Sequence, residues 1–350
     1  MSEEFTIYSA FKRIPFSTRA VGGLYLAVVI LGMIFGLSIF VLLRDSLHFF
    51  GVWAVLTLAN VPSIQSGTGP NFALPIGIVN GLLAMVLVLA AGFTGMAFIA
   101  IAALLAIVFG SISGYLYGRL MNAVKGSEMA IAPYTGFAIT AIFGLVWLTI
   151  PIGHPNMIFF LGDGLRHQIP LDYFRANFIL AELWQIQISD LVIRTGELLV
   201  VFVFCFLMWL FFRSKVGIGI SAVGRNPMFA KATGIDVDKS RVIANMISTA
   251  IAAVGIIIYA QGFGFIQLYD FPMLLAFPAV AGILVGGASG QRANVTNVVV
   301  GTFLFQGLLA IALPVFSRVL DGADVVNPLR MVIQNGIILY ALSRMSKGGK

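Results

Sequence analysis

The sequence predicts an all-α integral membrane protein with about ten transmembrane helices. Of its 350 residues, 59% are hydrophobic and only 10% are charged, whereas a soluble domain carries about 25% charged residues. A helix that crosses a bilayer needs about 20 mostly apolar residues. The chain between Ala20 and Leu342 consists of such runs and the connectors between them, so we expect no separate soluble domain.

Ten apolar runs, separated at proline, glycine or charged residues, are the predicted spans. In chain order they cover residues 20–43, 48–64, 72–93, 96–120, 129–152, 191–212, 242–262, 273–287, 295–316 and 329–342. The first run is longer than the apolar core of about 7 to 15 residues in a cleavable signal peptide, so we expect it to be retained. The spans form one transmembrane domain, residues 20–344, between an N-terminal segment, 1–19, and a tail, 345–350.

Basic residues predict the orientation, because the cytoplasmic loops of membrane proteins carry an excess of Lys and Arg. With the N-terminus in the cytoplasm, 15 of the 21 basic residues fall inside, namely Lys12, Arg13, Arg19, Arg119, Lys125, Arg213, Lys215, Arg225, Lys231, Lys239, Arg241, Arg292, Arg344, Lys347 and Lys350. Both termini are then cytoplasmic, with an external loop at 153–190 and a cytoplasmic loop at 213–241. The same bias accounts for the net charge of +7, so the charge gives no reason to expect a nucleic-acid partner.

Prolines interrupt the helices around the third span. Pro62, Pro70 and Pro75 fall within fourteen residues, and each removes a backbone donor and obstructs a helix. Broken helices in the two halves of a transporter point to its binding site, because freed backbone groups survive where they line a wet cavity. We therefore expect a solute path near Asn60, Gln65, Asn71, Phe72, Asn80 and Phe277, with simple packing as the alternative for each. The tripeptides at 73–75 and 276–278, Ala-Leu-Pro and Ala-Phe-Pro, suggest an internal repeat.

Glycines four residues apart predict close contacts between helices. Gly110, Gly114 and Gly118 share one helix face, as do the pairs at 77 and 81 and at 282 and 286. Small residues at this spacing let two helix backbones approach, so that dispersion holds them together. We expect packing inside one subunit rather than a dimerisation site.

The sequence predicts neither an enzyme nor a metal or cofactor site. His48, His154 and His167 have no Cys, Asp or Glu at ligand spacing, which argues against a metal cluster. No Gly-rich loop ends in Gly-Lys-Ser or Gly-Lys-Thr, so the chain lacks a P-loop for ATP. Arg194 and Glu197 can pair on one helix face, with a role in proton or solute movement as the alternative.

The cytoplasmic loop contains the signals for a short capped helix. Asn226 suits the N-cap, Pro227 the first helical position and Gly234 the left-handed position after the end, so we expect about two turns over residues 227–233. Such a helix, projecting small and apolar groups from a loop, suits a groove on a soluble partner.

Two stretches resemble a known family. Gly224, Asn226, Ala230, Thr233, Gly234 and Ile235 are similar to the coupling-helix motif of the permease subunits of bacterial ABC importers for ribose, other simple sugars and branched-chain amino acids. About sixty residues later, Gly286, Gly287, Ser289, Arg292, Gly301 and Thr302 match a second stretch of the same family. The resemblance covers residues 214–344.

The resemblance implies an importer subunit in the bacterial inner membrane. Such a complex has two permease subunits of about ten spans each, two cytoplasmic ATPase subunits and an extracytoplasmic binding protein. The residues that would couple to the ATPase are Gly224, Arg225, Asn226, Pro227, Met228, Phe229, Ala230, Thr233, Gly234 and Ile235. The expected solute is a simple sugar, with nucleosides or branched-chain amino acids as alternatives. A passive channel or a secondary transporter is the alternative from a different class, and the second permease is either a copy of this chain or a sibling.

Overall fold

The computed structural model describes residues 15–159, 164–188, 191–319 and 323–347. The predicted N-terminal segment up to position 14 and the tail from position 348 lie outside these residues. The described helices are α2 (Phe16–Ile34), α3 (Ile39–Leu58), α4 (Asn60–Gln65), α5 (Pro75–Ala90), α6 (Gly95–Ala123), α7 (Glu128–Thr149), α8 (Ile179–Glu182), α9 (Thr195–Phe211), α10 (Lys215–Arg225), α11 (Pro227–Ala232), α12 (Val237–Phe263), α13 (Phe271–Val285), α14 (Val295–Val319) and α15 (Ala323–Lys347). The described strands are β1 (Gln168–Pro170), β2 (Gln185–Ile188), β3 (Leu191–Arg194) and β4 (Phe265–Gln267), and η1 (Asp172–Phe174) is a 3-10 turn.

Each predicted apolar run contains a helix, but the number of ten spans is not confirmed. Among the described residues, seven helices are long and apolar enough to cross a membrane, or eight if the bent pair α9 and α10 counts as one span. The runs at 72–93 and 273–287 form α5 and α13, of only 16 and 15 residues. At 1.5 Å per residue these helices reach roughly 24 and 22 Å, short of a hydrocarbon core of about 30 Å.

Prolines set the lengths of these two short helices. Pro75 occupies the first turn of α5 and Pro272 the first turn of α13, where a missing amide hydrogen costs no helical bond. Pro278 lies inside α13, so the similar tripeptides at 73–75 and 276–278 occupy different places in their helices. That match therefore does not mark equivalent positions of a repeat.

The predicted boundary between the first two spans is wrong. The first run was expected to extend to position 43, but α2 ends nine residues earlier and α3 starts at position 39. Gly36 takes a left-handed conformation with φ of 82°, which glycine adopts readily, and the Ser38 side chain caps α3 by accepting a backbone hydrogen bond. Arg44 and Asp45 fall between the two predicted runs, but they lie inside α3 and pair with each other.

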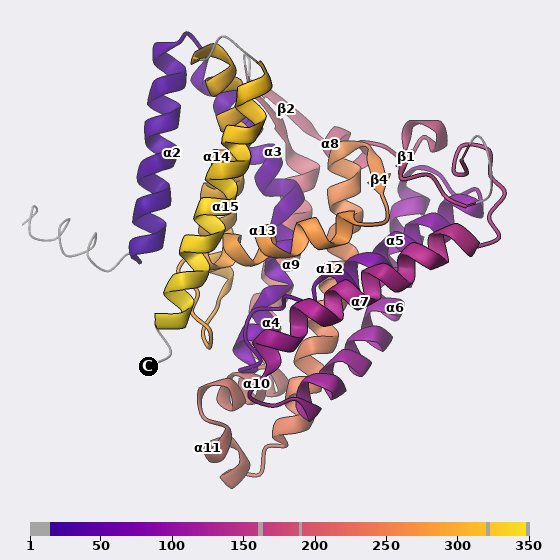
Figure 1. Cartoon of the computed structure of the whole chain (residues 1–350), viewed down its shortest axis with the longest axis vertical. Helices are drawn as coiled ribbons and strands as arrows, with labels where there is room; N and C mark the ends of the chain where they lie inside the picture. The colour runs from indigo at the N-terminus through magenta and orange to yellow at the C-terminus, as the bar shows by residue number, and fades with distance from the viewer. Residues whose placement is uncertain (1–14, 160–163, 189–190, 320–322, 348–350) are drawn as a thin grey trace, which may run out of the picture.

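The predicted sixth span starts too early, because residues 191–194 form strand β3. β3 pairs antiparallel with β2, and β1 pairs antiparallel with β4. Val192 and Ile193 are β-branched and favour the strand, and the pairing with β2 supplies their backbone partners. The strands lie at the end of the molecule opposite α11 (Figure 1), so the predicted loops 153–190 and 213–241 are at opposite ends.

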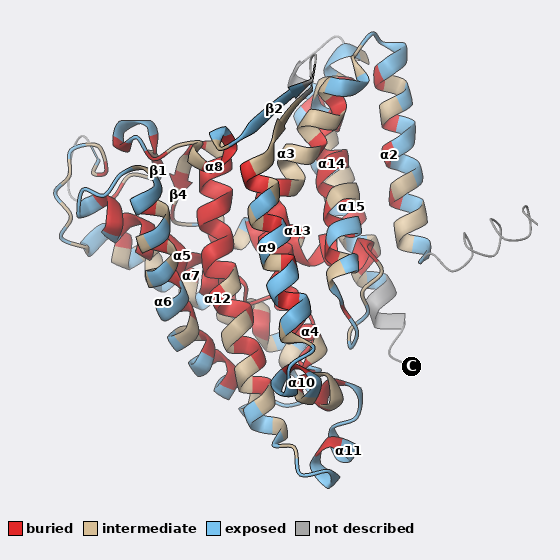
Figure 2. Cartoon of the chain, turned by 180° about the vertical axis from the view of Figure 1, so that it is seen from behind, coloured by how far each residue is buried: buried red, intermediate tan, exposed pale blue. Residues whose placement is uncertain are grey.

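The core surrounds α12, the most buried of the long apolar helices. In its most apolar window 78% of the residues are buried, and α3, α5 and α6 all pack against it. Figure 2 shows α12 as an almost continuous buried column toward the end that carries the strands. α13 runs across the other helices at mid-height in Figure 1, so it contacts α14, α15 and α5.

The glycine spacing on α6 marks its contact with α12, inside the subunit as predicted. A Cβ atom on Gly110 would lie 2.9 Å from Ala250 Cα, and one on Gly118 would lie 2.8 Å from Val242 Cα. Gly77 and Gly81 bring α5 against the same helix. A Cβ atom on Gly77 would lie 2.4 Å from the Thr249 carbonyl oxygen, and one on Gly81 would lie 2.2 Å from the Ala253 carbonyl oxygen. These short separations require glycine, because neither backbone can move aside without repacking.

Gly114→Ala is expected to lower the thermal midpoint of the purified protein. The new Cβ would lie 2.7 Å from Met246 Cα, and overpacking of this kind costs about 1–3 kcal/mol. Gly144→Ala in α7 is the matched control, because no atom lies within 4 Å of its Cβ and alanine favours a helix by about 1 kcal/mol over glycine. Equal midpoints for the two variants in the same detergent would contradict the packing argument.

Candidate functional site

The predicted short helix in the loop 213–241 forms as α11. The Asn226 side-chain oxygen accepts a hydrogen bond from Phe229 N at 3.0 Å, and Pro227 lies in the first turn. Gly234 follows the helix with φ of 81°. The helix prediction is confirmed at both ends, because the signals that set them lie within the segment itself.

α11 presents an exposed apolar tip at one end of the molecule (Figure 2). Met228 is 84% exposed and Phe229 is 61% exposed, whereas Ala230 is fully buried. Among the other predicted coupling residues, Arg225, Asn226, Pro227, Thr233 and Gly234 are exposed and Ile235 is half-buried. Neighbouring exposed apolar side chains on a polar loop are typical of a protein contact.

The loop 213–241 contacts the residues at the end of α4 through backbone atoms. A Cβ on Gly224, at the end of α10, would lie 2.1 Å from the Gln65 carbonyl oxygen and 3.0 Å from Gly67 N. Gly67 has φ of 78°, and its own Cβ would lie 3.1 Å from Gly224 Cα. The end of α10 and the end of α4 are therefore in direct backbone contact.

Both ends of the loop are anchored to the helical core. At its start, α9 and α10 bend by 76°, and the Ser214 side chain caps α10 by accepting from Gly217 N at 3.2 Å. Near its end, Asp238 pairs with Lys125 from the turn between α6 and α7. Arg241 pairs with Glu128 at the start of α7, so two ion pairs join the start of α12 to the turn between α6 and α7 and to α7 itself.

Two of the predicted path residues hold the broken helix together. Asn60 accepts a hydrogen bond from Asn71 N at 3.0 Å and donates to Thr57 O at 3.3 Å. Asn71 donates to the Ser248 hydroxyl at 2.8 Å, and both asparagines are fully buried. Their amides thus satisfy backbone and side-chain groups of the break, as buried polar groups require.

The remaining predicted path residues lie in different places. Asn80 donates to Ile76 O at 2.6 Å and to the Ser113 hydroxyl at 3.0 Å. Gln65 donates to Ala293 O, which links α4 to the loop before α14. The Phe72 and Phe277 rings lie 5.7 Å apart, and Phe277 lines a cavity of about 510 Å³ between α7, α13 and α15.

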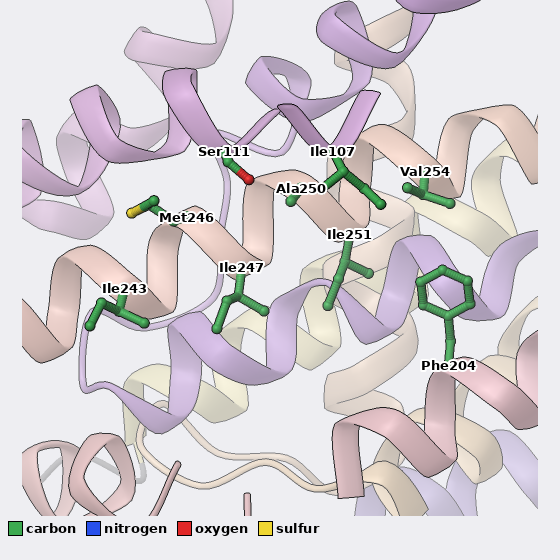
Figure 3. Close-up of a pocket in the computed structure, with 9 residues that line it drawn as sticks. All are labelled: Ile107, Ser111, Phe204, Ile243, Met246, Ile247, Ala250, Ile251 and Val254. Atoms are coloured by element: carbon green, nitrogen blue, oxygen red, sulfur yellow. The ribbon is translucent and has the colours of Figure 1, made fainter. Parts of the chain in front are cut away.

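A second cavity is almost entirely apolar (Figure 3). It has a volume of about 330 Å³ and lies between α6, α9 and α12. Ser111 contributes the one polar side chain among its lining residues, beside apolar groups such as Phe204, Met246 and Ile251. Polar solutes need several hydrogen-bonding groups in their sites, so this cavity does not suit one.

Glu197 gains a partner that sequence spacing did not indicate. The predicted pair is present, with Arg194 Nη1 3.9 Å from Glu197 Oε1, and His48 Nδ1 lies 2.9 Å from Glu197 Oε2. His48 thus does have an acidic neighbour, contrary to the prediction from spacing, because α3 packs against α9. Within the described ranges, no group of three or more His, Cys, Asp or Glu side chains could hold a metal ion.

The sequence profile of the family described as branched-chain amino acid transport system, permease component, matches residues 42–342. The chain belongs to this permease family. The match includes α11, the contact of α10 with α4 and both short helices. With seven or eight helices suited to cross a bilayer, the permease is a multi-pass membrane protein.

Two relatives of the permease are named as permease proteins of import or transport systems. The Autoinducer 2 import system permease protein LsrC of Photorhabdus luminescens is 24% identical over 79% of this chain and 77% of its own length. The nucleoside ABC transporter permease protein NupB of Lactococcus lactis is 23% identical over 53% of this chain and 50% of its own length. A solved metal-chelate type ABC transporter in an inward-facing conformation covers 93% of this chain at 16% identity, with a TM-score of 0.44.

Gly67 is not among the residues predicted from the sequence. The run Ser-Gly-Thr-Gly at 66–69 could have indicated a close contact here, because glycine tolerates a left-handed conformation and the close approach of another backbone. The permease places this run directly against Gly224, a residue that the sequence did mark.

Proposed function

We propose that this permease is the membrane subunit of an ABC importer in a bacterial inner membrane and forms the path for a small polar solute. Separate ATPase subunits supply the energy, and α11 is the segment that docks on them. The observation that supports this most is the capped α11, with exposed Met228 and Phe229 and a rigid backbone contact from Gly224 to Gln65.

The proposed solute is a simple sugar, and a nucleoside is the second candidate. The family resemblance of the coupling motif supports the sugar, and the relative named for nucleoside transport supports the second candidate. The family description names branched-chain amino acids, which remain the third option. The solute-path residues Asn60, Gln65, Asn71, Phe72, Asn80 and Phe277 are proposed to border or support this path.

The proposed complex contains a second permease subunit and an extracytoplasmic binding protein. We assign the binding protein to the end that carries the strands, with both termini of the permease in the cytoplasm. Tyr173 and Trp184 are exposed there, and exposed aromatic side chains are enriched at protein interfaces.

The importer is tested by uptake into proteoliposomes that contain the permease with the ATPase and binding-protein subunits that co-purify with it. Labelled ribose, uridine and leucine are the probes. Uptake of one of them is expected to fall by about tenfold or more without internal ATP, because ATP hydrolysis in the ATPase subunits would drive the conformational change that moves the solute. Uptake is also expected to persist after the proton gradient is collapsed. Uptake that continues without ATP would establish a channel or a secondary transporter instead.

A further inference from the structure

Arg330 is a charged residue inside a candidate membrane span and has no counter-charge among the described residues. It lies in the apolar window 325–343 of α15 and is half-buried. Its Nε atom is hidden from solvent and has no hydrogen-bond partner, and no carboxylate in the described part of the chain pairs with it. A charged side chain within an apolar span is costly and is a candidate for function, and Arg330 has no carboxylate partner among the described residues.

Arg330 lines a cavity that is closed on one side by aromatic rings. The cavity has a volume of about 140 Å³ and lies between α3, α12, α13, α14 and α15. Phe49, Trp53, Tyr259 and Phe263 line it and pack on one another, with Trp53 and Tyr259 rings 5.3 Å apart and perpendicular. Such a wall offers flat apolar surface to one face of a ring-shaped solute.

Gln306 adds a second unused donor to the same cavity. Its side chain lies on α14 and is only 2% exposed, yet its Nε2 has no hydrogen-bond partner. A buried amide normally finds one, and an unsatisfied polar group costs about 1–3 kcal/mol. Gln306 and Arg330 thus present donors without acceptors to one small space.

The cavity also adjoins the candidate solute path. Pro278 and Gln334 line it and line the cavity of about 510 Å³ that contains Phe277 as well. α13 carries both Phe277 and Pro278, and it crosses the other helices at mid-height (Figure 1). Arg330 and Gln306 therefore line a cavity that is next to the one that Phe277 lines.

We propose that the cavity of Arg330 and Gln306 is the recognition site for the solute, and that it takes a neutral ring rich in hydrogen-bond acceptors, as in a sugar or a nucleoside. Arginine has five donors and no acceptor, so hydroxyl, ring and carbonyl oxygens are its partners. A leucine zwitterion could pair its carboxylate with Arg330, but it is disfavoured because no acidic side chain among the described lining residues can pair with its ammonium group. The site rests on the proposed transport function and narrows its substrate class.

The test is equilibrium binding of tritiated uridine, ribose and leucine to the purified permease in nanodiscs, without nucleotide or partner proteins. Arg330→Gln is expected to raise the Kd for uridine or ribose by about tenfold or more, since one hydrogen bond to a charged group is worth about that factor. Arg318→Gln is the matched control, because Arg318 is exposed near the end of α14, outside the cavity. It is expected to leave the Kd unchanged.

Gln306→Glu separates recognition from folding. The carboxylate would supply the missing counter-charge within the cavity and remove a donor, so solute binding is expected to be lost while the thermal midpoint stays the same or rises. The site is overturned if uridine and ribose bind the wild type and Arg330→Gln equally, if leucine alone binds, or if none of the three binds. The binding test contains no ATP and no partner proteins, so its result does not depend on the uptake test. Uptake that continues without ATP, together with normal solute binding, would refute the importer but not the recognition site.

Discussion

Replacing Met228 and Phe229 together with alanine is expected to reduce ATP-driven uptake by about thirtyfold or more. Both side chains are exposed on a helix that is held rigid by Asn226 and Gly234. Truncating a central interface residue costs about 2 kcal/mol or more, and each 1.4 kcal/mol corresponds to about a factor of ten in affinity. Co-purification of the ATPase with the permease is expected to fall in parallel.

The matched control for this double variant is Phe93→Ala with Met96→Ala. These side chains are also exposed, but they flank the turn whose Gly95 N donates to Arg175 O at 3.3 Å, beside the folded loop at the other end. The control is expected to retain ATPase binding. Full ATPase binding and uptake in the Met228 and Phe229 variant would show that α11 is not the docking segment.

Gly224→Ala is expected to uncouple ATP hydrolysis from transport. Its Cβ would lie 2.1 Å from Gln65 O and 2.8 Å from Gln65 C. Both atoms are backbone, so α10 and α4 must separate, and overpacking of this kind costs about 1–3 kcal/mol. Because α11 itself is untouched, ATPase association and hydrolysis are expected to persist while uptake drops by about tenfold.

Gly219→Ala tests whether the effect belongs to the contact with α4. Gly219 lies in the same helix, and its Cβ would meet only Ile235 Cγ2, at 3.9 Å, an ordinary contact distance. This variant is expected to transport normally. If Gly224→Ala also transports normally, or if it loses the ATPase as the Met228 and Phe229 variant does, the contact is not the relay between them.

Features governed by neighbours along the chain could be predicted from the sequence. The composition fixes a membrane protein, because only long apolar helices satisfy their own backbone in lipid. The caps of α11 were predictable, since Asn226 and Gly234 act within two turns of the helix they delimit. The spacing of Gly110, Gly114 and Gly118 also predicted a close contact, because the period of the helix places them on one face.

Features that depend on residues far apart in the chain required the tertiary structure. The sequence marked Asn60 and Asn71 as polar groups in a broken helix, but Ser248 as the partner of Asn71 depends on how α12 packs against α4. Residues 191–194 looked like the start of a span, and only pairing with β2 made them a strand. The sequence shows that Arg330 is a charged residue in an apolar run. It does not show that Arg330 lies near Gln306 and Trp53, because these residues belong to two other helices.

The sequence by itself determined that this chain lies in a membrane, where its long apolar runs are, and which loop carries a capped helix. These are consequences of hydropathy and of hydrogen bonds between near neighbours. Only the tertiary structure decided which helix lies against the loop that carries this capped helix, and which donors without hydrogen-bond partners line the same cavity. The Gly224 contact with Gln65 and the cavity of Arg330 and Gln306 arise from the packing of distant helices, and no local rule fixes which helices become neighbours.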